Sequence, residues 1–211
     1  MRIHPGLVLA LMCLIAAPSN AAPPEPTVDD TRRADITATP PVAVFVYSTQ
    51  ADVSAEDQQT ALAVAKKALS TASVDVVWTV CVPGTCLTPT PAALKIRILP
   101  SRHTSGSEAN HLGHALIDSQ TRSGELATVF IDRTRRLAAN LGIDHRLLLG
   151  RTIAHELGHL LLATATHGNA GLMREIWSRD ELLGARRNDW EFDPHDAAAI
   201  RERVARSRRS S

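Results

Sequence analysis

The chain has 211 residues, of which 44% are hydrophobic, and it carries 23 Lys and Arg against 22 Asp and Glu. This near-neutral balance argues against nucleic acid or an anionic membrane surface as the main partner. The hydrophobic content, with only one long apolar run, favours a globular domain over a disordered or membrane-inserted chain.

The first 22 residues have the pattern of a secretory signal peptide. Arg2 gives a short basic start, residues 7–17 are apolar but too few to span a bilayer, and small residues follow up to Ala22. We therefore expect a secreted or periplasmic protein. Loss of Arg2 with this segment leaves 22 basic residues against 22 acidic ones, so the mature chain is neutral.

Residues 23–41 contain five prolines and few apolar residues, which predicts a linker before a single domain over residues 42–211. The expected strands of this domain are residues 42–47, 74–80, 94–99, 113–118 and 127–132. The expected helices are residues 54–72, an apolar helix from about Asp144, and a final helix that opens at Asp193 and Pro194 and reaches towards Arg206. This order of elements indicates an α+β or α/β domain.

Cys81 and Cys86 remain as an even pair once Cys13 leaves with the signal. An exported protein meets an oxidising environment, so we expect a disulfide between them. The Pro-Gly turn signal at residues 83–84 indicates that this bridge closes a short loop.

The most informative stretch holds His155, Glu156 and His159 in a His-Glu-x-x-His pattern within an apolar helical context. Four residues advance a helix by about one turn, so both imidazoles lie on one face and can bind one ion. Glu156, beside the first ligand, can accept a proton from a zinc-bound water without binding the metal itself. The pattern therefore predicts a zinc site with an adjacent general base.

Such a site needs a third protein ligand and leaves its fourth position to water. His167 is the nearest candidate, and Gly168 and Gly171 after it allow the chain to turn back. Glu175 and Glu181 are the alternatives, because some zinc peptidases take a glutamate from a later helix.

These residues, with Met173 after them, resemble the metzincin clan of zinc endopeptidases, whose motif is His-Glu-x-x-His-x-x-Gly-x-x-His followed by a methionine turn. The resemblance implies that His155, His159 and His167 bind zinc, that Glu156 is the general base and that Met173 lies in the turn beneath the metal. It also implies a twisted mixed sheet, an active-site helix, a C-terminal helix and an edge strand at the cleft.

The chain departs from the clan motif at three points. Leu162 and Ala165 stand where the motif has Gly and His, so the third His arrives two residues late. Without the glycine, we expect the helix to end in the helix-poor residues 164–166. Tyr47 is the only tyrosine, so no tyrosine follows Met173 near the metal.

The remaining candidates have weaker patterns. His111 and His114 suit a second metal or, more simply, an exposed loop and strand edge, whereas His103, His145 and His195 have no ligand-like spacing. Trp177 and Trp190 suit either a pocket wall or a small C-terminal core. The basic end is expected to be a solvated helix terminus; it comprises Arg201, Arg203, Arg206, Arg208 and Arg209.

We expect a monomeric, secreted zinc endopeptidase that acts on a peptide or protein substrate. By the metzincin resemblance, residues 113–118 form the edge strand that binds an extended peptide. Two other functions fit the same residues: a zinc-binding module without turnover, and a zinc amidase that cleaves a non-protein amide such as a cell-wall bond.

Overall fold

The computed structural model describes residues 41–48, 51–82, 86, 93–101, 111–184 and 188–207. The expected signal peptide and nearly all of the linker lie outside these residues, as do His103, Arg208 and Arg209. Among the helices of the described residues, none combines the length and the apolar character needed to cross a bilayer.

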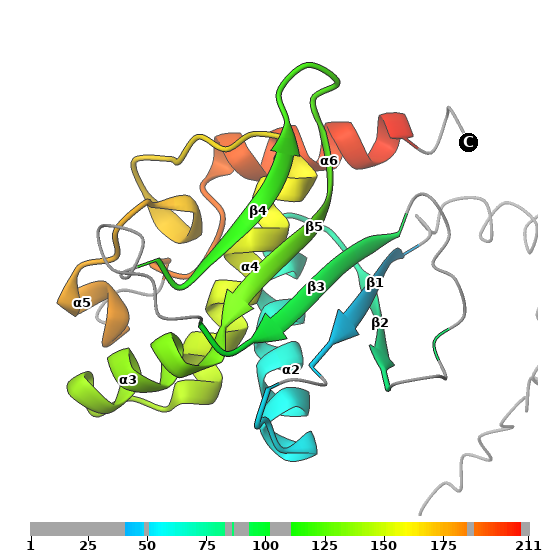
Figure 1. Ribbon diagram of the computed structural model, residues 1–211. Helices are drawn as coiled ribbons and strands as arrows, with labels where there is room; N and C mark the ends of the chain where they lie inside the picture. Colours follow the sequence, from blue (N-terminus) through cyan, green and yellow to red (C-terminus); the bar gives the residue numbers. More distant parts are fainter. Residues whose placement is uncertain are drawn as a thin grey trace, which may run out of the picture. The chain divides into compact units, whose positions relative to one another are not determined.

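Five strands form one mixed sheet, in the order β2-β1-β3-β5-β4 (Figure 1). Their bounds are β1 Val42–Tyr47, β2 Val76–Cys81, β3 Leu94–Leu99, β4 Gly113–Asp118 and β5 Ser123–Phe130. β1, β2, β3 and β5 pair in parallel, whereas β4 pairs antiparallel with β5 alone. The predicted strand over residues 113–118 is therefore confirmed as an edge strand.

Five helices and one 3-10 turn complete the described fold. They are α2 Ala55–Thr71, α3 Ile131–Leu141, α4 His145–Leu162, η2 Gly171–Met173, α5 Arg179–Leu182 and α6 Pro194–Ser207. The predicted α+β class and the helices over residues 54–72, from Asp144 and from Pro194 are confirmed. Cys81 and Cys86 form the expected disulfide, with their Cα atoms 5.3 Å apart.

The region after residue 118 differs from the expected turn and strand. The carboxylate of Asp118 accepts the N–H groups of Gln120 and Thr121 at 2.8 and 3.2 Å, which closes a short turn, so β5 already begins at Ser123. The predicted strand over residues 127–132 is therefore wrong at its end, because Ile131 opens α3.

Helix α3 was not expected. Ile131, Thr134 and Ala138 recur at helical spacing and are buried, and Gly142 ends the helix in the left-handed region with φ 68°. The second strand also starts later than expected: the N–H of Val74 donates to the carbonyl of Leu69 at 3.2 Å, so this residue belongs to the turn that ends α2.

Helix α4 packs against α2, α3, α6 and the strands β4 and β5, and α2 and α4 lie side by side on one face of the sheet (Figure 1). The inward side chains of the central strands are fully buried beneath them; these are Val44, Val46, Ile96 and Ile98. Gly150 permits the close approach of α2 and α4, because a Cβ there would lie 2.7 Å from Val64 Cβ. Packing on several sides therefore fixes the position of the predicted zinc helix.

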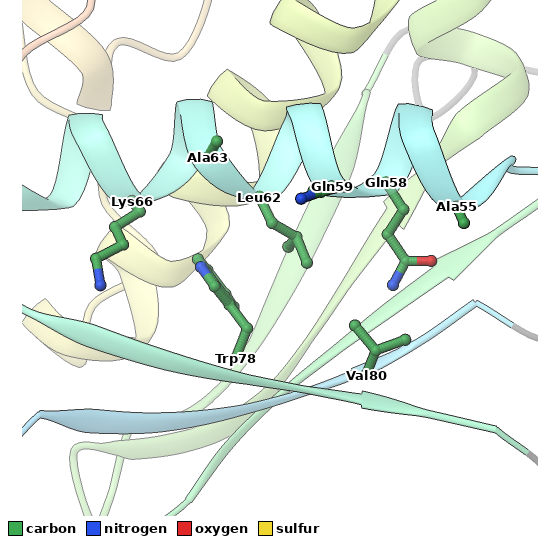
Figure 2. Close-up of a pocket in the computed structure, with 8 residues that line it drawn as sticks. All are labelled: Ala55, Gln58, Gln59, Leu62, Ala63, Lys66, Trp78 and Val80. Atoms are coloured by element: carbon green, nitrogen blue, oxygen red, sulfur yellow. The ribbon is translucent and has the colours of Figure 1, made fainter.

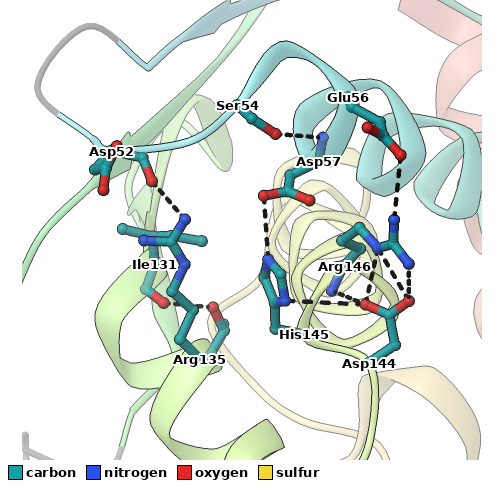
Figure 3. Close-up of polar contacts among 10 residues, drawn as sticks. Asp52, Ser54, Glu56, Asp57, Ile131, Arg135, Asp144, His145 and Arg146 are labelled. Carbon is teal, nitrogen blue, oxygen red and sulfur yellow. Dashed lines mark hydrogen bonds and ion pairs between the residues drawn. The ribbon is translucent and has the colours of Figure 1, made fainter.

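The N-terminal ends of α2 and α4 are joined by polar contacts (Figure 3). The carboxylate of Asp144 caps α4 by accepting the Arg146 N–H at 2.8 Å, and it also binds the Arg146 guanidinium at 2.7 Å. Arg146 lies 3.6 Å from Glu56, and His145 Nε2 lies 3.4 Å from Asp57. These partly exposed pairs connect the two helix ends and add little to stability.

A groove of about 430 Å³ lies between α2 and β2 (Figure 2). Its lining residues are Ala55, Gln58, Gln59, Leu62, Ala63, Lys66, Trp78 and Val80. Lys66 is the only titratable side chain among them, so the groove lacks an acid-base pair or a metal ligand set. Since β2 and β4 are opposite edges of the sheet, this groove is separate from the histidine motif beside β4.

Replacement of Gly150 tests the packing of α2 against α4. In an open helix, Gly150→Ala would stabilise by up to about 1 kcal/mol through helix propensity. Here the added methyl meets the backbone and side chains of α2, so we expect a net loss of about 1–3 kcal/mol in the free energy of unfolding. Urea denaturation measures this difference, and a rise in stability would contradict the close packing.

Candidate metal centre

Helix α4 carries His155, Glu156 and His159 in its last two turns, and all three side chains are buried. The helix ends at Leu162 because Ala163 takes the left-handed conformation, with φ 49° and ψ 49°. The expected end within residues 164–166 is thus slightly too late. A non-glycine residue in this conformation costs about 1–2 kcal/mol, and it turns the chain back towards the helix.

Two backbone carbonyls determine the tautomers of the helix histidines. His155 Nδ1 lies 2.7 Å from the Leu172 carbonyl oxygen, and His159 Nδ1 lies 2.9 Å from that of Thr164. A carbonyl oxygen can only accept, so each Nδ1 carries the proton and each Nε2 presents a lone pair. Burial lowers the pKa of His155 to about 3 and that of His159 to about 4, so both rings are neutral at neutral pH.

The Nε2 atoms of these rings converge with that of His167. His159 Nε2 lies 3.1 Å from His155 Nε2 and 3.3 Å from His167 Nε2. No proton lies between the first two atoms, so their lone pairs repel unless a cation binds both. Zn–N bonds of about 2.0–2.1 Å at tetrahedral angles place ligand nitrogens about 3.3 Å apart, and the observed spacing fits this value.

Among the described residues, His155, His159 and His167 are grouped closely enough for one ion, with ligand atoms within 4.8 Å of one another. His167 reaches the group from the loop after Ala163, in which the Thr166 N–H donates to Thr164 Oγ1 at 3.1 Å. The structure therefore brings together the three histidines expected as ligands, despite the late arrival of the third.

The two alternative ligands do not join this group. Glu181 accepts the Ser178 N–H at 2.7 Å and binds the Arg174 guanidinium at 2.6 Å, so it caps α5. Glu175 is exposed, and its charge opposes the lowering of the His167 pKa that burial causes. Glu175 therefore influences His167 through its charge, but it does not belong to the group of possible ligands.

The side chain of Glu156 extends from α4 towards Gly113 of β4. It is 4% exposed, and within the described part of the chain its Oε2 finds no hydrogen-bond partner. A Cβ at Gly113 of β4 would lie 2.7 Å from Glu156 Oε1, so only glycine leaves room for this carboxyl group. Burial raises the pKa of Glu156 to about 8. A buried carboxyl group without partners is costly for stability, which is typical of a group retained for its chemistry.

Met173 packs against α4 at Gly158, and it is 1% exposed. A Cβ at Gly158 would lie 3.3 Å from Met173 Cε and 2.8 Å from Phe192 Cε1, so the glycine in α4 makes space for both side chains. The Gly168 N–H donates to the Met173 carbonyl at 2.8 Å, which closes the loop that carries His167. Met173 therefore joins the loop that carries His167 to α4, and its position beneath a bound metal stays a prediction.

The two tryptophans pack in the core, which is one of the two roles considered for them. The Trp177 ring meets the His155 ring edge to face, with centroids 5.4 Å apart, and it packs against Trp190 at 4.9 Å. Both rings also pack against the hydrophobic core. Trp177 is thus adjacent to the histidine group, and Trp190 lies behind it.

The other described histidines do not contribute ligand atoms to this group. His114 packs against the ring of Phe130, with centroids 5.6 Å apart, and His145 pairs with Asp57 as described above. His111 is exposed at the start of β4 and is not grouped with other ligands in the described residues. His195 lies with Asp193 and Asp196 at the start of α6, in a second small group of possible ligand atoms.

The described part of the basic end is a solvated helix terminus, as expected. Arg206 forms an i,i+4 ion pair with Glu202 at 2.9 Å, and Arg203 donates to the Arg122 carbonyl at 3.0 Å.

Sequence reasoning missed three contributors to the site: Gly113, Gly158 and the Leu172 carbonyl. A glycine in the middle of an apolar helix signals close packing, so Gly158 had a visible signal.

In comparisons with known proteins, no family model matches the chain and no curated protein sequence matches it. Geometry and chemistry therefore carry the functional conclusion.

The histidine geometry predicts the metal content of the purified protein. We expect about one zinc per chain, with most of it lost in His155→Ala and His159→Ala and weaker binding in His167→Ala. Elemental analysis after gel filtration measures this. Glu181→Ala is the matched control, because its carboxylate is engaged in capping α5, and it should keep its zinc. Full zinc in the His155→Ala and His159→Ala variants would refute the site.

Proposed function

We propose that this protein is a secreted or periplasmic zinc endopeptidase of metzincin-like type, with His155, His159 and His167 as metal ligands and Glu156 as general base. One observation carries the proposal: lone pairs on imidazoles fixed by backbone carbonyls converge on one point. The next residue after His155 adds a buried carboxyl group whose Oε2 has no hydrogen-bond partner among the described residues. Polar groups that serve only the fold are normally hydrogen-bonded when they are buried, so unpaired acceptors of this kind indicate a site that binds or reacts.

The residues of the chain divide the chemistry between them. When bound, zinc supplies Lewis acidity, which polarises a carbonyl group and makes water more acidic. Burial favours the neutral form of Glu156, and the positive charge of a bound zinc ion would favour the carboxylate. As a carboxylate, Glu156 would accept a proton from the attacking water and pass it to the departing amine. The Leu172 and Thr164 carbonyls hold the imidazoles of His155 and His159 in the neutral, Nδ1-protonated form throughout.

The edge strand β4 supports a peptide as the substrate. The Phe130 N–H donates to the Leu112 carbonyl at 2.8 Å, and bonding alternates along an antiparallel pair. His114 and Leu116 therefore bond to β5, whereas the N–H and C=O groups of Gly113 and Ala115 face away from it. Gly113 also contacts Glu156, so an extended peptide added to this edge passes beside the general base.

Replacement of Glu156 separates metal binding from catalysis. Because Glu156 is proposed as a base and not as a ligand, Glu156→Ala and Glu156→Gln should retain zinc while hydrolysis of a denatured protein falls by about a hundredfold or more. Turnover is measured beside zinc content, with a chelator control. Unchanged turnover or loss of zinc would contradict the role. Cleavage of peptidoglycan but not of denatured protein would indicate the amidase alternative.

A pair of proline variants tests peptide binding at β4. Ala115→Pro removes an outward N–H and should raise KM for a peptide substrate while zinc content is unchanged. Leu116→Pro removes an N–H that bonds to β5, so it should instead lower the stability of the fold. Peptide kinetics and thermal unfolding distinguish the two outcomes. A normal KM in Ala115→Pro would contradict binding of the substrate as an added strand.

A further inference from the structure

The Leu172 carbonyl accepts two hydrogen bonds. His155 Nδ1 donates to it at 2.7 Å, and Trp177 Nε1 donates at 3.3 Å. A carbonyl oxygen has two lone pairs, so it can accept both donors at once. The indole N–H thus fixes the same oxygen that orients the imidazole of His155.

The indole ring also contacts the imidazole directly. The two rings meet at 86°, with their centroids 5.4 Å apart, which is a favourable edge-to-face arrangement for aromatic groups. A ring in this position limits rotation of the imidazole about its own bond to Cβ. The N–H and the ring of Trp177 therefore restrain two different parts of the same ligand.

Trp177 is itself held from behind by a column of contacts that begins on α4. Trp190 packs against Trp177 at 4.9 Å, and the guanidinium carbon of Arg151 lies 3.7 Å from the centre of the Trp190 ring. Arg151 precedes His155 by four residues, so it lies on the same face of the helix. It also donates to the Leu182 carbonyl at 3.3 Å.

The charge on Arg151 is retained at neutral pH. Burial lowers its pKa to about 10, which still leaves the guanidinium protonated. A partly desolvated cation over an indole face is a strong form of this contact. Arg151 of α4 therefore contacts Trp190, Trp190 contacts Trp177, and Trp177 contacts His155 of the same helix. These contacts on both sides fix the position of Trp177.

We propose that Trp177 is a positioning residue of the metal centre, which holds the Leu172 carbonyl and the His155 imidazole so that His155 Nε2 points at the ion. This inference rests on the proposed zinc site. Groups that orient a metal ligand through one intermediate contact typically change metal affinity by about 10–100-fold when they are replaced. Trp177 provides such support through two contacts, one with the Leu172 carbonyl and one with the His155 ring.

The test uses the full mature chain and Zn²⁺ affinity, measured by competition with a chromophoric chelator. Trp177→Phe keeps an aromatic ring but loses the N–H, and we expect its zinc affinity to fall about tenfold. Trp177→Ala loses both contacts, so we expect its zinc affinity to fall further, by up to about a hundredfold. Trp78→Phe, in the groove between α2 and β2, is the matched control and should bind zinc as the wild type does.

Two further readouts separate positioning from simple loss of stability. In the Co²⁺-loaded protein, Trp177→Phe should shift the visible absorption bands that report ligand geometry, and Trp78→Phe should not. The metal-free Trp177→Phe protein should unfold at nearly the wild-type urea concentration.

Several results would overturn the inference. Wild-type zinc affinity and cobalt spectrum in Trp177→Phe would show that the residue does not position His155. A loss of affinity matched by an equal loss of metal-free stability would assign it to the fold alone. Failure of the wild type to bind zinc would instead overturn the proposed metal site, and this inference with it.

Discussion

The hydrogen bond from His155 Nδ1 to the Leu172 carbonyl is the interaction on which the rest of the site depends. It fixes the tautomer of His155, and the equivalent bond from His159 to Thr164 does the same for the second ring. The chain after α4 must therefore turn back at once, and Ala163 in the left-handed region performs that turn. With both Nε2 lone pairs directed inward and 3.1 Å apart, a bound cation would relieve their repulsion.

The packing of α4 offsets the free-energy cost of burying the polar side chains of His155, Glu156 and His159. Helix α4 packs against α2, α3, α6, η2, β3, β4 and β5. These apolar contacts offset the burial of two imidazoles and of a carboxyl group whose Oε2 has no hydrogen-bond partner among the described residues. Three glycines let neighbouring groups approach it closely: Gly150 towards α2, Gly158 towards Met173, and Gly113 of β4 towards Glu156. The proposed metal centre and the core therefore share one set of contacts, so a change in the packing of α4 would also move the three histidines.

Local periodicity explains which features could be predicted from the sequence. His155 and His159 are four residues apart on a helix, so their common face follows from the repeat of the helix. The edge position of residues 113–118 was expected from the metzincin resemblance, not from periodicity. The contacts of Gly113 with Glu156 and of Trp177 with Leu172 could not be predicted, because they depend on how distant segments close over α4. Helix α3 was missed although Gly142 and the buried positions Ile131 and Ala138 carried its signal; the strand pattern before them was extended too far.

Nitrogen NMR of the imidazoles tests the central claim most directly, because it observes the protonation of each ring nitrogen before and after zinc is added. In the metal-free protein, His155 and His159 should be neutral and protonated at Nδ1. On addition of Zn²⁺, the Nε2 resonances of both rings and of His167 should shift, while the Nδ1 protons remain. Protons on Nε2 of His155 and His159 in the metal-free protein, or Nε2 resonances that zinc leaves unchanged, would contradict this account of the site.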